Sequence, residues 1–127
     1  MREFFAVKQG ELTQAAVLQQ NFAQVMTEIA KTIPQATTVA VRAQVQQAVP
    51  HMEAVAANWT EVLEGIDKLW CCTGLARYYE SLSLWTEAER CYQRSLEISQ
   101  TELGERHPDT ATSLNNLAGL YLSLIHI

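Results

Sequence analysis

The stretch that decides the fold is "LARYYESLSLWTEAERCYQRSLEISQTELGERHPDTATSLNNLAGLY", which runs from Leu75 to Tyr121. Its two ends share a triplet of residues with one spacing: Leu75, Ala76 and Tyr79 recur 42 residues later as Leu117, Ala118 and Tyr121. A small residue between two large ones allows the backbone of a neighbouring helix to approach closely. The repeated triplet therefore predicts two equivalent helices in a stack of helix pairs.

The segment between the two triplets has the pattern of a second helix. Ala88 and Ser95 are small residues seven positions apart with Tyr92 between them, which places all three on one face. We expect Thr86 to cap this helix at its start and Gly104 to end it. Pro108 then suits the first turn of a further helix, because its missing N–H would have no partner there.

Upstream of this stretch, apolar residues recur at helical spacing between Glu11 and Ile33, and Pro34 ends the pattern. The expected buried face consists of Leu12, Ala15, Leu18, Phe22, Val25, Met26, Ile29 and Ile33. No segment alternates apolar and polar residues with the period of a strand. The sequence therefore predicts an all-α protein.

Three further signals lie between these two patterns. Thr37 or Thr38 suits the N-cap of a second helix, and Pro50 interrupts that helix before a third one. We expect the third helix to end at Gly65. Asp67 is the expected N-cap of the helix that carries the first triplet.

The composition favours a folded helical protein and argues against nucleic acid and membrane as partners. Hydrophobic residues make up 48% of the 127 residues, whereas there are only five Gly and three Pro. The net charge is −5, and the Lys and Arg residues are scattered singly, so no basic patch is present to bind phosphates. No apolar run reaches the roughly 20 residues of a membrane-spanning helix. Because the N-terminus also has no recognisable signal peptide, we expect a cytoplasmic location.

The repeated pattern resembles the tetratricopeptide repeat (TPR), with a large residue, Leu, a small residue and Tyr on the first helix, and Ala and an aromatic residue on the second. The matching residues are Cys72, Leu75, Ala76, Tyr79, Ala88, Tyr92 and Ser95. The period of 42 residues exceeds the usual ~34 and is similar to the kinesin-light-chain type of repeat, common in bacterial multi-repeat proteins. Ser83 departs from the family pattern, which has Gly there, and Ser95 replaces the common Ala. The resemblance covers about Leu69 to Tyr121 and implies antiparallel helix pairs stacked as a right-handed α-solenoid.

In the resembled family, the first helix of each repeat lines a concave groove that binds a peptide or protein partner. The outward-facing positions of these helices are Thr73, Arg77, Glu80, Ser81, Thr112, Asn115, Asn116 and Gly119. An Asn side chain suits this task because it has both donors and an acceptor for a peptide backbone. For any one of these residues, an ordinary solvated surface position is an equally good interpretation. The resemblance implies a protein-binding scaffold.

The first seventy residues, through "MREFFAVK" and "AVPHMEAVA", also resemble the helical segment that precedes TPR arrays in bacterial STAND signalling ATPases, which have an NB-ARC-like nucleotide domain. The chain has no GxxxxGK[ST] loop to bind phosphates, so such an NTPase domain would lie upstream of Met1. The alternative function is therefore a sensor or regulatory part of a larger ATPase, with further TPR units in the same full-length chain.

The sequence points to no catalytic, cofactor or metal site. The cysteines are odd in number, and the neighbours Cys71 and Cys72 do not readily bridge each other, so a disulfide framework is not expected. Cys72 and Cys91 lie on apolar stripes and are expected in the core, which leaves Cys71 as the most accessible thiol. No motif places a base and an acid beside a Ser or Cys nucleophile.

The histidines are likewise not expected to bind a metal. His51, His107 and His126 are far apart in sequence, and no Cys/His spacing matches a zinc site. The tripeptide His-Pro-Asp at 107–109 also occurs in J-domain co-chaperones, but here it lies in the turn between repeats. We therefore expect Pro108 and Asp109 to cap the following helix.

The expected organisation is a helical segment at 1–36, a helical hairpin at 37–66, one TPR unit at 67–107 and the first helix of the next unit at 108–121. Residues 122–127, "LSLIHI", do not continue the repeat pattern and correspond to the translation of a transposon end used in sequencing libraries. We expect them to be a non-native tail. Because about three repeats are needed for stability, we also expect the isolated chain to be marginally stable, with a fraying last helix.

Overall fold

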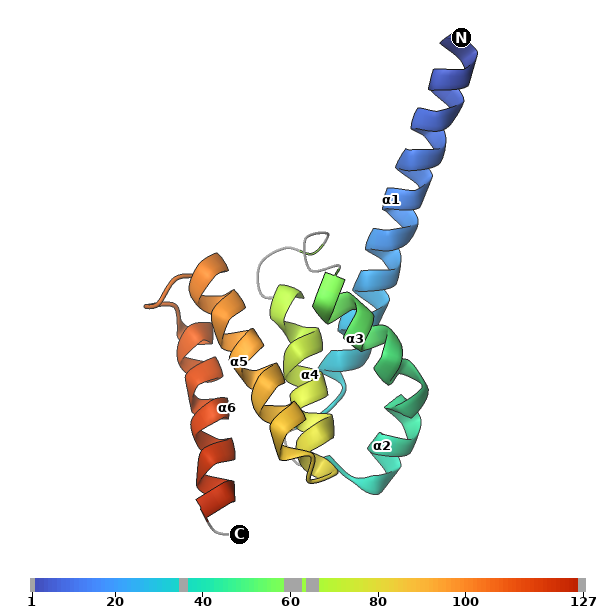
Figure 1. Ribbon diagram of the computed structural model, residues 1–127. Helices are drawn as coiled ribbons and strands as arrows, with labels where there is room; N and C mark the ends of the chain where they lie inside the picture. Colours follow the sequence, from blue (N-terminus) through green and yellow to red (C-terminus); the bar gives the residue numbers. More distant parts are fainter. Residues whose placement is uncertain (1, 35–36, 59–62, 64–66, 126–127) are drawn as a thin grey trace.

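The computed structural model describes residues 2–34, 37–58, 63 and 67–125, and the regular elements in these ranges are all helices. Their order is α1 (Arg2–Lys31), α2 (Val39–Val45), the short 3-10 helix η1 (Gln46–Ala48), α3 (Val49–Asn58), α4 (Asp67–Ser81), α5 (Trp85–Glu102) and α6 (Pro108–Ile125). Figure 1 shows α4 between α1 and α3 on one side and α5, followed by α6, on the other. The prediction of an all-α helical repeat fold is confirmed.

Helix α4 packs on both sides because apolar and small residues cover most of its circumference. The side toward α1 and α3 joins a cluster that includes Ile33, Met52 and Leu75, none of them more than 2% exposed. The side toward α5 and α6 joins a second cluster, formed by Ala76, Ala88, Tyr92 and Leu120. Burial on two faces holds α4 between the N-terminal helices and the C-terminal helix pair.

The first triplet lies in the interior, as predicted, whereas the second is only partly covered, with Leu117 half-buried against the α4–α5–α6 cluster. Leu75 and Ala76 are buried, and Tyr79 is half-buried. On α6, Ala118 is exposed and Tyr121 is 40% exposed. None of the described helices covers this face of α6, so the close helix approach expected at Ala118 is absent from the described residues.

The buried face of α1 is shorter than the sequence indicated. The helix begins at Arg2 and ends at Lys31, not at Glu11 and Ile33 as expected. Leu18 and Val25 are 68% and 53% exposed, so their assignment to the buried face was wrong. Figure 1 shows that the N-terminal half of α1 extends away from the other helices, which therefore cover only its C-terminal part.

The N-terminal caps agree with the predictions in part. The Thr38 hydroxyl accepts a hydrogen bond from the Val41 N–H at 3.3 Å, which confirms the expected cap of α2. The prediction for Thr86 was wrong, because α5 begins at Trp85 and the capping position is Leu84, whose side chain makes no such bond. Sequence alone does not distinguish a cap from a polar residue within the first turn.

Two neighbouring segments begin differently from the expected pattern. Pro50 lies in the first turn of α3, and the break that it was expected to cause occurs earlier, as the 3-10 helix at 46–48. Asp67 is the first residue of α4, and its carboxylate lies 3.0 Å from the ammonium of Lys31 in α1. The expected stop at Gly65 lies outside the described residues.

The turn between α4 and α5 has a left-handed residue where the TPR pattern has Gly. Ser83 has a φ of 59°. Its N–H donates to the carbonyl of Glu80 at 3.0 Å, and the N–H of Leu84 donates to the carbonyl of Tyr79 at 2.9 Å. This pair of bonds is the Schellman arrangement, which favours Gly at the left-handed position.

The turn between α5 and α6 follows the sequence prediction more closely. Gly104 has a φ of 93° and ends α5 as expected. Pro108 is the first residue of α6. His107 also takes part, because its Nδ1 accepts a hydrogen bond from the N–H of Asp109 at 3.1 Å.

Candidate functional site

A small hollow of about 220 Å³ opens between α4, α5 and α6. Its lining residues are Glu80, Tyr92, Asn115, Asn116, Gly119 and Leu120, and we call this hollow the asparagine pocket. Four of these residues, Glu80, Asn115, Asn116 and Gly119, are among the groove positions inferred from the repeat pattern. The structure thus brings half of the eight predicted groove residues together in one hollow.

Tyr92 lines the pocket beside Glu80 and holds this side of it in place. Its ring is 4% exposed, and its hydroxyl donates a hydrogen bond of 2.9 Å to the carboxylate of Glu80. Burial raises the pKa of the Tyr92 hydroxyl well above its usual value of about 10, and the nearby Glu80 carboxylate acts in the same direction. The phenol therefore stays protonated near neutral pH and fixes the position of the carboxylate.

Asn115 and Asn116 supply the neutral polar groups of the pocket. Asn115 is exposed and Asn116 is half-buried. Within the described part of the chain, neither side-chain amide makes a hydrogen bond. Each amide thus has donors and an acceptor available for an incoming backbone or polar group.

Gly119 keeps the pocket open. A β-carbon built at this position would meet no atom within 4 Å, so packing within the protein does not require a glycine here. Glycine in the middle of a helix costs about 1 kcal/mol relative to Ala. The absence of a side chain leaves room for a group outside the chain to approach the helix backbone.

Three of the other predicted groove residues bond to the protein itself. Arg77 donates to the carbonyl of Ile33 at 3.0 Å, just beyond α1. The Ser81 hydroxyl donates to the carbonyl of Tyr78 at 2.6 Å. Thr112 is exposed on α6, and its hydroxyl donates to the carbonyl of Pro108 at 3.2 Å. None of the three lines the asparagine pocket.

Thr73 is placed differently from the sequence expectation. Its side chain is 3% exposed, and its hydroxyl shares a hydrogen bond of 2.8 Å with the hydroxyl of Ser95 in α5. A side chain that is buried between two helices does not face a ligand, so the outward position assigned to Thr73 was wrong. Ser95 stands where the family commonly has Ala, and this hydrogen bond gives both residues a structural role.

Two lining residues, Tyr92 and Leu120, were not predicted as part of the site. Tyr92 matches a repeat position, and its ring is buried as expected. Its role in holding Glu80 could have been inferred from its hydroxyl group. A buried tyrosine needs a hydrogen-bond partner, whereas a buried phenylalanine does not. Leu120 is 1% exposed, and no feature of the sequence separates it from an ordinary core residue.

The accessibility of the three thiols differs from the sequence prediction for Cys71 and Cys91. Cys71, expected to be the most accessible, is fully buried, and Cys91, expected in the core, is half-buried. Burial raises the pKa of Cys71 and Cys91 to about 11 and that of Cys72 to about 12. All three are therefore protonated near neutral pH, which argues against a reactive thiolate.

The described residues contain neither a candidate metal centre nor a membrane-spanning helix. No group of three or more His, Cys, Asp or Glu side chains there is arranged to hold a metal ion. Among the same residues, no helix combines the length and the hydropathy that crossing a membrane requires.

Comparison with known proteins identifies the C-terminal part of the chain. Residues 69–124 match the family model of the tetratricopeptide repeat. Nephrocystin-3 from Xenopus laevis is 46% identical over 48 residues, which are 38% of this chain and 4% of that protein. Nephrocystin-3 from Mus musculus is 40% identical over 63 residues, which are 46% of this chain and 5% of that protein.

The matches concern a small part of much longer proteins. The chain covers only 4% to 5% of the length of these relatives. No solved structure gives a significant match. Since the relatives are eukaryotic, they lend no support to the bacterial ATPase context suggested by the first seventy residues.

Proposed function

Residues 69–124 are a tetratricopeptide repeat region, and on this premise we propose that the chain is part of a protein-binding scaffold with no catalytic activity of its own. The proposed contact surface is the asparagine pocket, and the proposed partner is an extended segment of another protein. The observation that carries the proposal is the convergence of Glu80 from α4 with Asn115, Asn116 and Gly119 from α6.

The size of the asparagine pocket favours a protein partner over a small molecule. Sites for drug-sized ligands occupy about 300–1,000 Å³. The volume of about 220 Å³ is below that range and suits one or two side chains of a longer segment. The remaining contacts of such a segment would lie along the exposed face of α6.

The chemistry of the pocket favours recognition of a peptide backbone. The amides of Asn115 and Asn116 offer donors and an acceptor, which matches the alternating N–H and C=O groups of an extended strand. The carboxylate of Glu80 is held by Tyr92 and adds a fixed acceptor. Fixed groups bind more tightly than mobile ones, because less conformational entropy is lost on binding.

The experiment is a selection of random peptides displayed on phage against the 127-residue chain, followed by measurement of Kd for the selected peptides. We expect Asn116→Ala to raise Kd by about fivefold to tenfold, the effect of losing one or two hydrogen bonds. Gly119→Leu should prevent binding because its side chain fills the pocket. Gln93→Ala, on the exposed side of α5, is the matched control and should leave Kd unchanged.

The selection also defines a result that would contradict the proposal. If selected peptides bind Gly119→Leu and Asn116→Ala as tightly as the unchanged chain, the pocket is not the contact surface. Circular dichroism of each variant confirms that its helical content is retained.

A further inference from the structure

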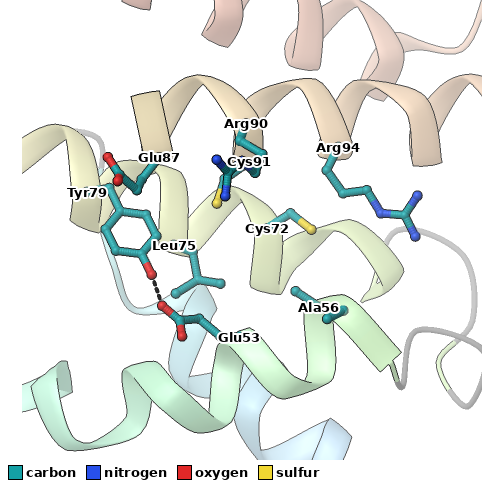
Figure 2. Close-up of a pocket in the computed structure, with 10 residues that line it drawn as sticks. Glu53, Ala56, Cys72, Leu75, Tyr79, Glu87, Arg90, Cys91 and Arg94 are labelled. Atoms are coloured by element: carbon teal, nitrogen blue, oxygen red, sulfur yellow. Dashed lines mark hydrogen bonds between the residues drawn. The ribbon is translucent and has the colours of Figure 1, made fainter. Parts of the chain in front are cut away.

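A second and larger hollow lies between α3 and α5, on a different face of α4 from the asparagine pocket. Its volume is about 460 Å³, which falls within the range of sites for small ligands. Figure 2 shows Leu75 and Cys72 of α4 between the two outer helices, α3 and α5. Both residues line the hollow at its base, but each is only 2% exposed, so the half-buried Ala56 and Tyr79, which also line it, present more apolar surface to a ligand. We call it the charged groove, for the residues along its sides.

The charged side chains of the groove are sorted by sign along its length. Glu87, Arg90 and Arg94 follow one another on α5 at a spacing of three and four residues, which places them on one side of the helix. Figure 2 shows Glu87 at the end near Tyr79, Arg94 at the other end and Arg90 between them. Glu53 of α3 lies on the side of Tyr79, whose hydroxyl donates a hydrogen bond to it. The groove therefore has an acidic end and a basic end.

These charges are available to a ligand. Arg90 and Glu87 make no ion pair or side-chain hydrogen bond within the part of the chain that the structure describes. Arg94 lies 3.7 Å from Glu97, but both side chains are largely exposed, and such a contact contributes little to stability. The hydrogen bond from Tyr79 uses only one of the two carboxylate oxygens of Glu53.

The distance between the two ends matches a short peptide. Glu87 and Arg94 are seven residues apart on α5, which corresponds to about 10 Å at a rise of about 1.5 Å per residue. Three residues of extended peptide span about the same distance, at about 3.3 Å each. The terminal ammonium of a free peptide complements the acidic end, and its terminal carboxylate complements the basic end.

We propose that the charged groove binds a free peptide of about three apolar residues. Its ammonium pairs with Glu53 and Glu87, and its carboxylate pairs with Arg90 and Arg94, a type of charged pair that arginine forms well. Its side chains contact the apolar part of the lining, at Ala56 and Tyr79 and over Leu75 and Cys72. This site is separate from the asparagine pocket and binds a different class of ligand, a small peptide rather than a segment of a partner protein.

Other small ligands complement the groove less completely. A fatty acid would pair with the arginines but would leave the two glutamates beside an apolar chain. A neutral apolar molecule would leave both ends without a partner. Covering a charged group without a partner is unfavourable, so the two ends together select a dipolar ligand with an apolar middle.

The test titrates the tripeptide Leu-Ala-Leu into the full 127-residue chain, with binding followed by calorimetry and by NMR. The N-acetylated peptide lacks the ammonium, and the C-amidated peptide lacks the carboxylate. We expect each blocked form to bind about tenfold or more weakly than the free peptide, because each loses one set of charged hydrogen bonds. Decanoate, which has only the carboxylate, should bind more weakly as well.

Two double variants test which residues of the groove bind each end of the peptide. In the double variant Arg90→Gln and Arg94→Gln, the free and C-amidated peptides should bind equally, because the carboxylate has lost its partners. In the double variant Glu53→Gln and Glu87→Gln, the free and N-acetylated peptides should bind equally. Arg106→Gln is the control for the loss of an arginine, since it removes one positive charge from an exposed position outside the groove and should leave the difference between the free and blocked peptides unchanged.

Several results would overturn the proposal. They are the absence of binding at millimolar peptide, equal affinity for the free and blocked peptides, or equal affinity for decanoate. The proposal would also be overturned if the arginine double variant still bound the free peptide more tightly than the C-amidated peptide. Such a result would show that Arg90 and Arg94 do not bind the peptide carboxylate. Circular dichroism establishes that each variant is folded, so that a loss of binding reports on the groove.

Discussion

Gly74 in α4 lies directly against Ala30 in α1. A β-carbon built at Gly74 would stand 2.9 Å from both the β-carbon and the carbonyl oxygen of Ala30. Non-bonded carbon atoms prefer about 3.5–4.0 Å, so the two helices can approach this closely only with a glycine at position 74. Ala30 itself is fully buried, and this contact joins the N-terminal helix to the repeat region.

We therefore expect Gly74→Ala to lower the free energy of unfolding by about 1–2 kcal/mol, as overpacking does in a well-packed core. The loss should occur although Ala is the better helix former by about 1 kcal/mol. Urea unfolding followed by circular dichroism measures the change.

The same substitution at Gly119 is the control for Gly74→Ala. A β-carbon there meets nothing within 4 Å, so Gly119→Ala should raise the free energy of unfolding by about 0.5–1 kcal/mol. If both substitutions stabilise the chain to a similar extent, α1 does not pack on α4 as described.

The contrast between these glycines shows what the sequence could predict. The triplet at Leu75, Ala76 and Tyr79 predicted a buried helix correctly, because burial of a repeat position depends mostly on spacing along the helix itself. The sequence assigned no role to Gly74, since its constraint comes from Ala30, 44 residues earlier in the chain. Contacts between distant helices leave no local pattern.

The candidate site could be predicted from the sequence only in part. The resemblance assigned Asn115, Asn116 and Gly119 to a groove by their positions on a repeat helix, and in the structure they line one hollow with Glu80. Thr73 was assigned to the same surface but is buried, because its hydroxyl has a partner in Ser95 on the next helix. Helical spacing gives the direction of a side chain but does not show which neighbouring helix covers it.

The turn at Ser83 leads to a second prediction. Its φ of 59° lies in the left-handed region, which costs a residue other than glycine about 1 kcal/mol. Ser83→Gly should therefore raise the free energy of unfolding by about 0.5–1 kcal/mol, measured by urea unfolding. Gly104→Ser makes the reverse change at a φ of 93° and should destabilise the chain. A loss of stability in Ser83→Gly would show that the Ser83 side chain contributes more than its backbone strain costs.

The thiols give a third prediction, on chemical reactivity. Cys91 is half-buried and lines the charged groove, whereas Cys71 and Cys72 are buried. At pH 8 we expect iodoacetamide to modify Cys91 first and the other two only after unfolding in urea, as followed by mass spectrometry. The rate at Cys91 should increase with pH up to about 11, the pKa to which burial raises this thiol. Modification of Cys71 as fast as Cys91 would contradict the described packing of α4 on α1.

A fourth prediction concerns stability at alkaline pH. The pKa of the Cys71 thiol is about 11 in the native state and 9.0 in the unfolded state. Between these two pH values the native state keeps a proton that the unfolded state has lost. The unfolded state then binds fewer protons, and the free energy of unfolding falls as pH rises. We expect this decline to begin at about pH 9 in urea titrations of the chain. A free energy of unfolding that stays constant between pH 8 and pH 11 would show that the thiols are accessible to solvent.

Tyr92 should contribute to this decline above about pH 10, its usual pKa, because burial and the Glu80 carboxylate raise its native pKa. Tyr92→Phe removes the bond to Glu80 and should cost about 1–3 kcal/mol at neutral pH, as a hydrogen bond to a charged group does. Since the variant has no phenol to titrate, its stability should fall less steeply above pH 10, and the difference from the unchanged chain should narrow. Tyr121→Phe is the control, because this tyrosine is 40% exposed and its hydroxyl makes only a long, exposed hydrogen bond of 3.4 Å to the Glu89 carboxylate, so both values should change much less. Parallel pH curves for the unchanged chain and Tyr92→Phe would mean that the Tyr92 phenol titrates alike in the folded and unfolded states, and so that it is not buried against Glu80.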